Sequence, residues 1–169
     1  MKYTIRKMTL DDVAAVIELD QRSFSLPWPE RSFRFELTDN PASRCWVAEL
    51  DAKIIGMIVV WLIVDEAHVA TLATHPDFRR QGIAKRLLAH ALRNLLDEGA
   101  RNSFLEVRES NTAAREMYRK FGYEETGRRR RYYKDNDEDA ILMNLDSLKV
   151  EQLIFDDRST LDKEEQNER

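Results

Sequence analysis

Cysteine, proline and glycine are scarce in this sequence of 169 residues, which contains one Cys, four Pro and five Gly. The single thiol, Cys45, cannot form an internal disulfide and cannot by itself build a thiolate metal site, so we expect neither a disulfide framework nor a bound metal. We interpret Cys45 as a small apolar residue within a strand. Stability must come from packing of the hydrophobic side chains, which make up 43% of the chain.

Long apolar runs and an excess of positive charge are also missing. The longest apolar run, Ile54–Val64, is much shorter than the roughly 20 residues that a membrane-spanning helix needs, so we expect no membrane span. Residues 1–7 lack the continuous apolar stretch of a secretory signal, which favours a cytoplasmic location. Lys and Arg number 27 against 31 Asp and Glu, and this net charge of −4 argues against nucleic acid as a partner.

A change in composition after Asp146 predicts a domain boundary. Residues 147–169 carry seven acidic and four basic side chains, so most of the net negative charge lies in this segment. We expect one globular domain over residues 1–146, followed by an acidic tail. Val150, Leu153 and Ile154 have helical spacing, which predicts a short amphipathic helix that docks on the domain, whereas residues 162–169 are expected to be disordered.

Hydrophobic periodicity predicts a mixed order of strands and helices. Strands are expected at residues 3–7, 45–50, 54–64, 68–74, 103–107, 128–133 and 140–145, and helices from near Thr9, from Pro29, and over 83–96 and 111–121. Segment 54–64 is apolar throughout, so it is expected to be buried on both faces. The pattern indicates an α/β (α+β) domain with a central mixed sheet and helices on its faces.

A short basic loop precedes the strongest predicted helix. Residues 79–84 read Arg-Arg-Gln-Gly-Ile-Ala and connect the strand that ends at Thr74 to the Leu-rich helix. Free N–H groups in the first turn of a helix bind phosphate, and Gly82 would let the backbone approach such a ligand. Lys85 and Arg86 oppose the helix dipole, a cost that a bound polyanion would offset. A basic helix start without any ligand fits these residues equally well.

Further motifs make the sequence resemble a known family. The loop follows Leu-Ala-Thr-His-Pro at 72–76, and later motifs are Leu-Glu-Val-Arg at 105–108, Ser-Asn at 110–111, Ala-Ala at 113–114, Tyr118, Phe-Gly-Tyr at 121–123, Arg-Tyr-Tyr at 131–133 and Glu-Asp-Ala at 138–140. Residues 1–146 resemble the Gcn5-related N-acetyltransferases (GNAT), and most of all the RimI-type ribosomal-protein alanine acetyltransferases and their archaeal relatives. Ala84 replaces the second glycine of the family loop, and Thr74 replaces a usual Val.

The resemblance implies the GNAT fold, a mixed and mostly antiparallel sheet of about seven strands flanked by about four helices. It also implies acetyl-CoA as cosubstrate and no metal. The residues that correspond to the cofactor site are Leu72, Ala73, Thr74, Arg79, Arg80, Gln81, Gly82, Ile83, Ala84, Lys85, Asn111 and Tyr118. In this resemblance Glu106 is the general base, Tyr118 protonates the leaving thiolate, and Asn111 bonds the pantetheine or phosphate arm.

The catalytic candidates each have a structural alternative. Glu106 lies in an apolar strand, where partial desolvation would make its carboxylate a stronger base, but a salt bridge with a nearby Arg would also explain it. Tyr118 shares a helix face with Asn111 and is either a proton donor or a core residue. His68 matches a histidine of the archaeal relatives and is a candidate second base acting through water.

The substrate side rests mainly on the resemblance. Tyr132 and Tyr133 are expected to clamp a peptide, and Trp28 either lines the peptide groove or packs in the core. Glu66 either attracts a substrate ammonium or lies in a solvated connection. The run Arg128–Arg131 favours a solvated hairpin strand over an RNA-binding surface.

These observations predict a single-domain acetyltransferase in which an amine attacks acetyl-CoA directly in a ternary complex. The leading substrate is a protein N-terminus, with a ribosomal protein as the implied target. A small-molecule amine acetyltransferase acting on a polyamine or aminoglycoside is the alternative, and a non-catalytic acyl-CoA-binding module is a third hypothesis. We expect a monomer or a weak homodimer, with no membrane or nucleic-acid partner.

Overall fold

The computed structural model describes residues 1–149 and 153, and its elements follow the predicted order. The strands are β1 (Thr4–Lys7), β2 (Ser43–Leu50), β3 (Lys53–Ile63), β4 (Glu66–Thr74), β5 (Asn102–Arg108), β6 (Glu124–Tyr133) and β7 (Glu138–Asp146). The helices are α1 (Val13–Ser23), α2 (Glu30–Thr38), α3 (Ile83–Asp97) and α4 (Thr112–Phe121), with short 3₁₀ turns at Leu10–Asp12 and Pro76–Phe78. Each strand and helix predicted within residues 1–146 is present, with its ends shifted by a few residues.

The strands form one mixed sheet in the order β1-β2-β3-β4-β5-β7-β6. All neighbouring pairs are antiparallel except β4 and β5, which are parallel. The central strand β3 is buried over most of its length, as its continuous apolar sequence predicts. The predicted fold class, a mostly antiparallel mixed sheet with helices on its faces, is confirmed.

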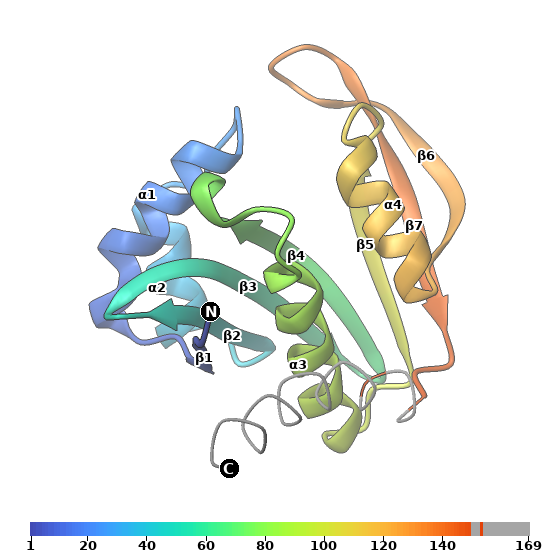
Figure 1. Cartoon of the computed structure of the whole chain (residues 1–169). Helices are drawn as coiled ribbons and strands as arrows, with labels where there is room; N and C mark the ends of the chain where they lie inside the picture. Colours follow the sequence, from blue (N-terminus) through green and yellow to red (C-terminus); the bar gives the residue numbers. More distant parts are fainter. Residues whose placement is uncertain (150–152, 154–169) are drawn as a thin grey trace.

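Helices cover both faces of this sheet and divide the core into two clusters. Helices α3 and α4 pack on one face, where Leu88 and Leu92 of α3 are fully buried against the strands (Figure 1). Helices α1 and α2 pack on the other face through Val16 and Phe33. Within the described residues, no helix is both long and apolar enough to cross a membrane.

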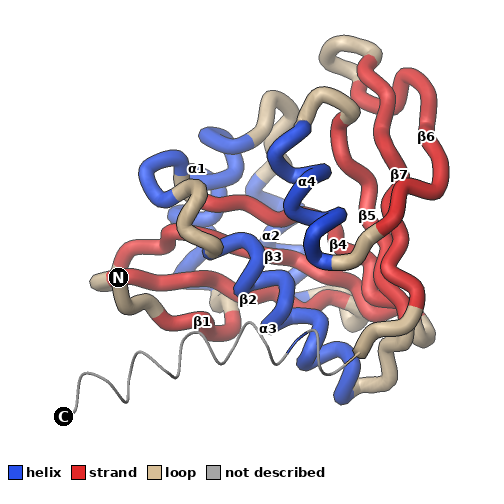
Figure 2. Tube along the Cα trace, turned by 45° about the vertical axis from the view of Figure 1, so that its right-hand side comes forward, coloured by secondary structure: helices blue, strands red, loops and turns tan. Residues whose placement is uncertain are grey.

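The parallel strands β4 and β5 pair over only a short length, and the candidate site lies where this pairing ends. Pairing runs only from Glu66 opposite Asn102 to Val69 opposite Leu105. On its other edge, β4 has a bulge: Val69 lies opposite Val60 and Thr71 opposite Val59, which leaves Ala70 as an extra residue. A bulge bends its strand and increases the local twist. Beyond the bulge β4 and β5 diverge, as Figures 1 and 2 show from two directions.

The hydrophobic core extends past the predicted boundary at Asp146. Leu148 is buried, and the Leu153 side chain is 1% exposed within the cluster that α3 and α4 cover. Leu153 is helical. Val150, Ile154 and the segment 162–169 lie outside the described residues. Residues after Asp146 therefore contribute to packing of the domain.

Candidate functional site

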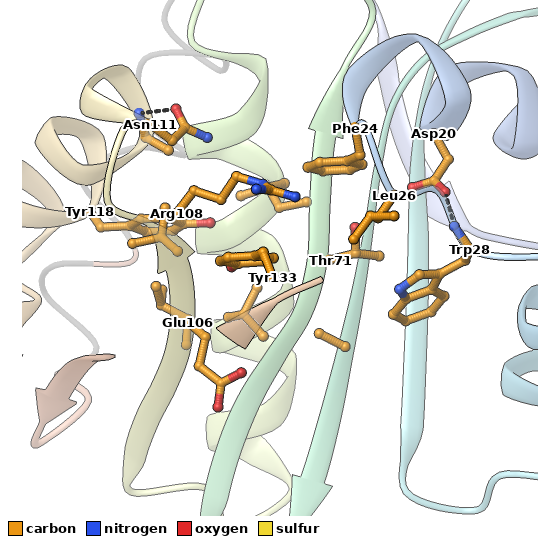
Figure 3. A pocket seen from close by; sticks show the side chains of 16 residues that line it. Asp20, Phe24, Leu26, Trp28, Thr71, Glu106, Arg108, Asn111, Tyr118 and Tyr133 are labelled. Carbon is orange, nitrogen blue, oxygen red and sulfur yellow. Dashed lines mark hydrogen bonds between the residues drawn. The ribbon is translucent and has the colours of Figure 1, made fainter. Parts of the chain in front are cut away.

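A pocket of about 220 Å³ opens where β4 and β5 diverge (Figure 3). Its walls come from five parts of the chain. Strand β4 contributes Val69, Ala70, Thr71 and Leu72; β5 contributes Leu105, Glu106, Val107 and Arg108; the start of α4 and its cap contribute Asn111, Ala114 and Tyr118; the end of α1 and the connection to α2 contribute Asp20, Phe24, Leu26 and Trp28; and β6 contributes Tyr133.

Glu106 is the carboxylate that β5 presents to this pocket. Its neighbours Leu105 and Val107 are buried in the core, and strand alternation places Glu106 on the opposite face. Its Oε1 lies 3.3 Å from Nε of Arg129, so the salt bridge that the sequence left open as an alternative is present. The Tyr132 hydroxyl donates a hydrogen bond to the same carboxylate, which raises the pKa of Tyr132. Glu106 thus has two partners from β6 and still lines the pocket.

Tyr118 faces the pocket from α4. The side chain is buried, with its ring edge-on to Tyr123 at a centroid distance of 5.5 Å. Burial raises the pKa of Tyr118 well above its ordinary value, because the phenolate would lose its hydration. Tyr118 therefore keeps its proton at neutral pH and can donate it. Both interpretations from the sequence, core residue and proton donor, are compatible with this position.

Asn111 stands at the start of the same helix. Its Oδ1 accepts a hydrogen bond from the backbone N–H of Ala114 at 3.2 Å, which makes it the N-cap of α4. The cap fixes the side chain at the edge of the pocket, where Figure 3 shows it above Arg108 and Tyr118. An amide held in this way is positioned to bond a bound molecule through its nitrogen.

Arg108 joins three walls of the pocket. Its guanidinium donates to Asp135 at 2.9 Å and to Glu138 at 3.2 Å, both on the β6–β7 hairpin, and lies 4.0 Å from the centre of the Tyr133 ring. The same group lies 3.2 Å from Oγ of Ser25 in the α1–α2 connection. Ser25 in turn donates to Asp135 at 2.5 Å. Arg108 thereby ties the hairpin and the α1–α2 connection to β5.

Asp20 and Trp28 form the wall on the α1 side. The backbone N–H of Trp28 donates to Oδ2 of Asp20 at 2.7 Å, which closes the α1–α2 connection back onto α1. The Trp28 ring packs on Phe33, with centroids 5.2 Å apart, and also lines the pocket. Trp28 therefore packs on the core and also lines the pocket, and its contact with a peptide stays a prediction. Burial raises the pKa of Asp20, and the Trp28 hydrogen bond lowers it by less.

The N-terminus of α3 is open. Gly82 is its N-cap with φ +76°, a left-handed conformation that favours glycine, and nothing lies within 4 Å of where a Cβ would be. Arg80 in the preceding loop is also left-handed, at φ +62°, and its side chain is exposed. Ile83 is buried in the core, so a ligand here would meet its backbone N–H and not its side chain. These features fit an anionic group approaching the first turn of the helix.

Comparison with known proteins identifies the family. The acetyltransferase (GNAT) family model matches residues 13–123. The chain belongs to the acetyltransferase (GNAT) family. GNAT proteins use acetyl-CoA, and this chain is an acetyl-CoA-dependent N-acetyltransferase.

The similar GNAT proteins include ribosomal-protein acetyltransferases. The chain is 33% identical over 153 residues to the [ribosomal protein bS18]-alanine N-acetyltransferase of Escherichia coli K12, covering 84% of this chain and 96% of the relative. A crystal structure of that enzyme type from E. coli superposes with a TM-score of 0.79 at 32% identity, covering 88% of this chain and 96% of the other. A Bacillus subtilis (strain 168) protein, provisionally given the same name, is 37% identical over 142 residues, covering 84% and 94%.

The GNAT fold brings many of the predicted site residues together. Leu72, Glu106, Asn111, Tyr118, Trp28 and Tyr133 all line the pocket. Tyr132 is exposed but contacts Glu106 and packs edge-on against Tyr133 at 5.1 Å. The predicted loop residues Arg79, Arg80, Gln81, Gly82, Ala84 and Lys85 lie around the start of α3, beyond the pocket walls.

Four predicted residues occupy other surroundings. His68 packs edge-on against Trp61, with centroids 5.6 Å apart, in the part of β4 that still pairs with β5. Glu66 is exposed at the first position of β4, and neither residue lines the pocket. Ala73 is buried against the α1–α2 cluster. Thr74 has a buried Oγ1 without a hydrogen-bond partner among the described residues, while its carbonyl accepts from Arg79 at 3.4 Å.

The pocket lining also includes Asp20, Phe24, Leu26 and Arg108, which are not among the site residues predicted from the sequence. A signal for Asp20 exists: it follows Val13 by seven residues and Val16 by four, so it falls on the buried stripe of α1. A carboxylate on such a stripe is unusual.

The run Arg128–Arg131 lies on the exposed strand β6, as the favoured interpretation of a solvated hairpin strand predicts. Arg128 pairs with Asp139 at 2.7 Å and with Glu109 at 3.0 Å.

Proposed function

We propose that this chain acetylates the α-amine at the N-terminus of a ribosomal protein, with an N-terminal alanine as the preferred first residue. One observation carries the proposal: a single pocket places a carboxylate and a buried, protonated tyrosine on walls formed by β5 and α4, opposite a wall formed by the α1–α2 connection. The named activity of the E. coli and B. subtilis relatives supports the choice of ribosomal-protein alanine.

Acetyl-CoA, when bound, supplies an activated thioester that an amine can attack without an acyl-enzyme step. The open first turn of α3, with Gly82 and the basic loop before it, would hold the pyrophosphate, and Asn111 would bond the pantetheine arm. Glu106 accepts the proton that the substrate amine gives up. Tyr118 carries a proton at its hydroxyl for the departing sulfur.

Proton affinity favours an α-amine over a lysine side chain. Reference pKa values near 7.7 to 8.0 and 10.4 leave roughly a tenth of α-amines neutral at pH 7, against fewer than about one in a thousand lysine amines. A carboxylate base of moderate strength suits the former. Tyr133 and Trp28, which line opposite sides of the pocket, would hold the first residues of an extended peptide.

A competition experiment tests the proposal. One peptide carries an N-terminal alanine with a free α-amine and an internal lysine, and its control has the N-terminus already acetylated. After incubation with enzyme and acetyl-CoA, fragmentation mass spectrometry should locate the new acetyl group on the α-amine of the first peptide and find none on the control. Acetylation mainly on lysine would contradict the proposal. Fast turnover of a polyamine or aminoglycoside without any peptide reaction would favour the small-molecule alternative.

A further inference from the structure

Asp20 differs from the other buried acids of the described residues in having a side-chain oxygen that is fully covered and still has no hydrogen-bond partner. Asp12 is matched by the Arg6 guanidinium and by the Thr9 backbone N–H, each at 2.8 Å. Glu36 accepts from the Asn40 amide and the Trp61 indole, both at 2.9 Å. Asp20 is 1% exposed, and its Oδ1 has no hydrogen-bond partner in the part of the chain that the structure describes.

No charged side chain in the described part of the chain compensates Asp20. Arg22, two residues along, is engaged by Glu18 at 3.1 Å and lies 3.4 Å from the His75 ring. The pKa of Asp20 is raised by burial and is lowered only by the Trp28 backbone N–H, so no cationic side chain of the described residues contributes. A buried carboxylate with a single neutral donor destabilises the fold, because it has lost its hydration without a matching gain.

The unpaired oxygen belongs to the wall of the acetylation pocket. Asp20 lines the pocket at the end of α1, and Glu106 lines it from β5 on the other side. In Figure 3 one oxygen of Asp20 bonds Trp28, and the other points away from Trp28 on the pocket side. A donor that arrives with the substrate would therefore complete the hydrogen bonding of this carboxylate.

We propose that Asp20 is a substrate-binding residue, whose Oδ1 accepts a hydrogen bond from the α-ammonium group of the substrate while Oδ2 keeps its hold on the Trp28 backbone. This inference rests on the proposed function, since every N-terminal substrate carries that group. At pH 7 most α-amines are protonated, so the arriving group is a cation with N–H donors. The ammonium group supplies both the positive charge and the hydrogen-bond donor that the Asp20 carboxylate lacks. Glu106 remains the group that takes the proton before attack.

Access to Oδ1 requires a small movement on the same wall. The oxygen is covered by the surrounding side chains. Leu26, another member of this wall, is 47% exposed and lies in the α1–α2 connection, outside any helix or strand. Leu26 and Asp20 line the same pocket, so the proposal assigns the opening of the carboxylate to a change in the Leu26 side chain. Binding of the first residue would then bring an apolar side chain next to Leu26 and the ammonium next to Asp20.

The variant Asp20→Asn separates this role from that of holding the loop. The asparagine carbonyl can still accept from Trp28, whereas its NH₂ group replaces Oδ1 and the charge is gone. We expect kcat/KM for an alanine peptide to fall at least tenfold, mainly through KM, with unchanged acetyl-CoA affinity in calorimetry. The matched control is Glu36→Gln, a buried acid away from the pocket, which should keep kcat/KM within about twofold.

Peptides that differ only at the first residue test whether the group bound by Asp20 Oδ1 is the α-ammonium. Alanine and serine peptides should lose activity equally in Asp20→Asn, because the α-ammonium is common to both; a loss confined to the serine peptide would overturn the proposal in favour of a side-chain hydroxyl. A peptide with propionyl in place of alanyl lacks only the amine, so it should bind wild type at least tenfold more weakly than the alanine peptide. That difference should shrink to less than twofold in Asp20→Asn.

Three further outcomes would overturn either the role of Asp20 or the proposed function. Equal wild-type binding of the amine and propionyl peptides overturns the role of Asp20, even if Asp20→Asn cannot be obtained folded. Unchanged kcat/KM in a folded Asp20→Asn variant overturns it as well. Failure of wild type to acetylate any peptide would refute the proposed function itself, which distinguishes that failure from an error about Asp20.

Discussion

Glu106 and Tyr118 are the residues whose removal should affect chemistry and not binding. Glu106→Gln and Tyr118→Phe keep the shape of each side chain while removing a base and an acid, so each should lower kcat by roughly 10² to 10⁴. Steady-state assays on an alanine peptide measure kcat for each variant. Calorimetry should show unchanged acetyl-CoA affinity. Tyr123→Phe is the control, because Tyr123 is equally buried but bonds Ser103 at 2.7 Å outside the pocket.

Two results would change this assignment. If both variants kept near wild-type kcat, neither residue would be an acid or base of the reaction. His68→Gln would then be the next variant to measure, since His68 is the remaining candidate base, although it packs against Trp61 beside the pocket. A drop in the Tyr123→Phe control as large as that in Tyr118→Phe would show that disturbed packing lowers the rate.

Asp20 should also leave a signature in the pH dependence of stability. Its pKa is raised in the folded state by burial, so the folded chain binds this proton more tightly than the unfolded chain does. The resulting penalty is absent below the unfolded pKa of about 3.9 and complete above the folded pKa. Asp20→Asn should therefore be at least as stable as wild type at pH 7 in urea unfolding. Its advantage should shrink as the pH falls toward about 4; an advantage that grows toward acid would contradict the assignment.

At the scale of elements, the first turn of α3 should control cofactor affinity. Gly82→Val places a branched side chain at φ +76°, where it strains the backbone and stands between a polyanion and the helix N-terminus. Acetyl-CoA affinity should fall more than tenfold, or about 1.4 kcal/mol. Gly99→Val is a matched control at the other end of α3, since Gly99 is also left-handed, at φ +108°, with open space around it. It should destabilise the chain and leave the affinity unchanged.

The β6–β7 hairpin should control peptide binding through Arg108. Arg108→Gln removes the ion pairs to Asp135 and Glu138 and the contact with the Tyr133 ring. The tip of the hairpin then loses its side-chain link to β5, while β7 stays paired with β5. The KM for a peptide should rise about tenfold, while acetyl-CoA affinity changes little. Arg128→Gln is the control, because Arg128 is also ion-paired but lies on the exposed face of β6. Equal effects of the two variants would rule out a specific role for Arg108.

The sequence predicted the order of the elements well and the site only in part. Element order follows from local patterns, such as the spacing of Leu residues in α3 and the glycine after α4. The divergence of β4 and β5 depends on the extra residue Ala70, which no periodicity reveals because its consequence appears only when β3 pairs with β4. Arg108 belongs to the Leu-Glu-Val-Arg motif, but the motif does not indicate that this side chain links separate elements, since its partners Ser25 and Asp135 are distant in sequence.

At the scale of the whole molecule, the pocket depends on parts of the chain that are far apart. Its walls run from Asp20 at the end of α1 to Tyr133 at the end of β6, and they meet only because the sheet holds β4 and β5 in register at one end. Loss of global stability should therefore abolish activity as a single step. The residues that hold the sheet together without lining the pocket should affect the temperature range of activity and leave kcat unchanged.

Leu153 tests this separation, because it is 1% exposed in the core and comes after all pocket residues in the chain. Leu153→Ala should cost about 2 to 5 kcal/mol of unfolding free energy, the usual range for a buried leucine. A chain ending at Leu148 should lose at least as much. Both should keep wild-type kcat when assayed well below their unfolding temperatures. Val64→Ala, at a position 91% exposed, should cost almost nothing. A chain ending at Leu148 with full stability would show that Leu153 adds nothing to the core, and one that is folded but inactive would place this segment in the chemistry.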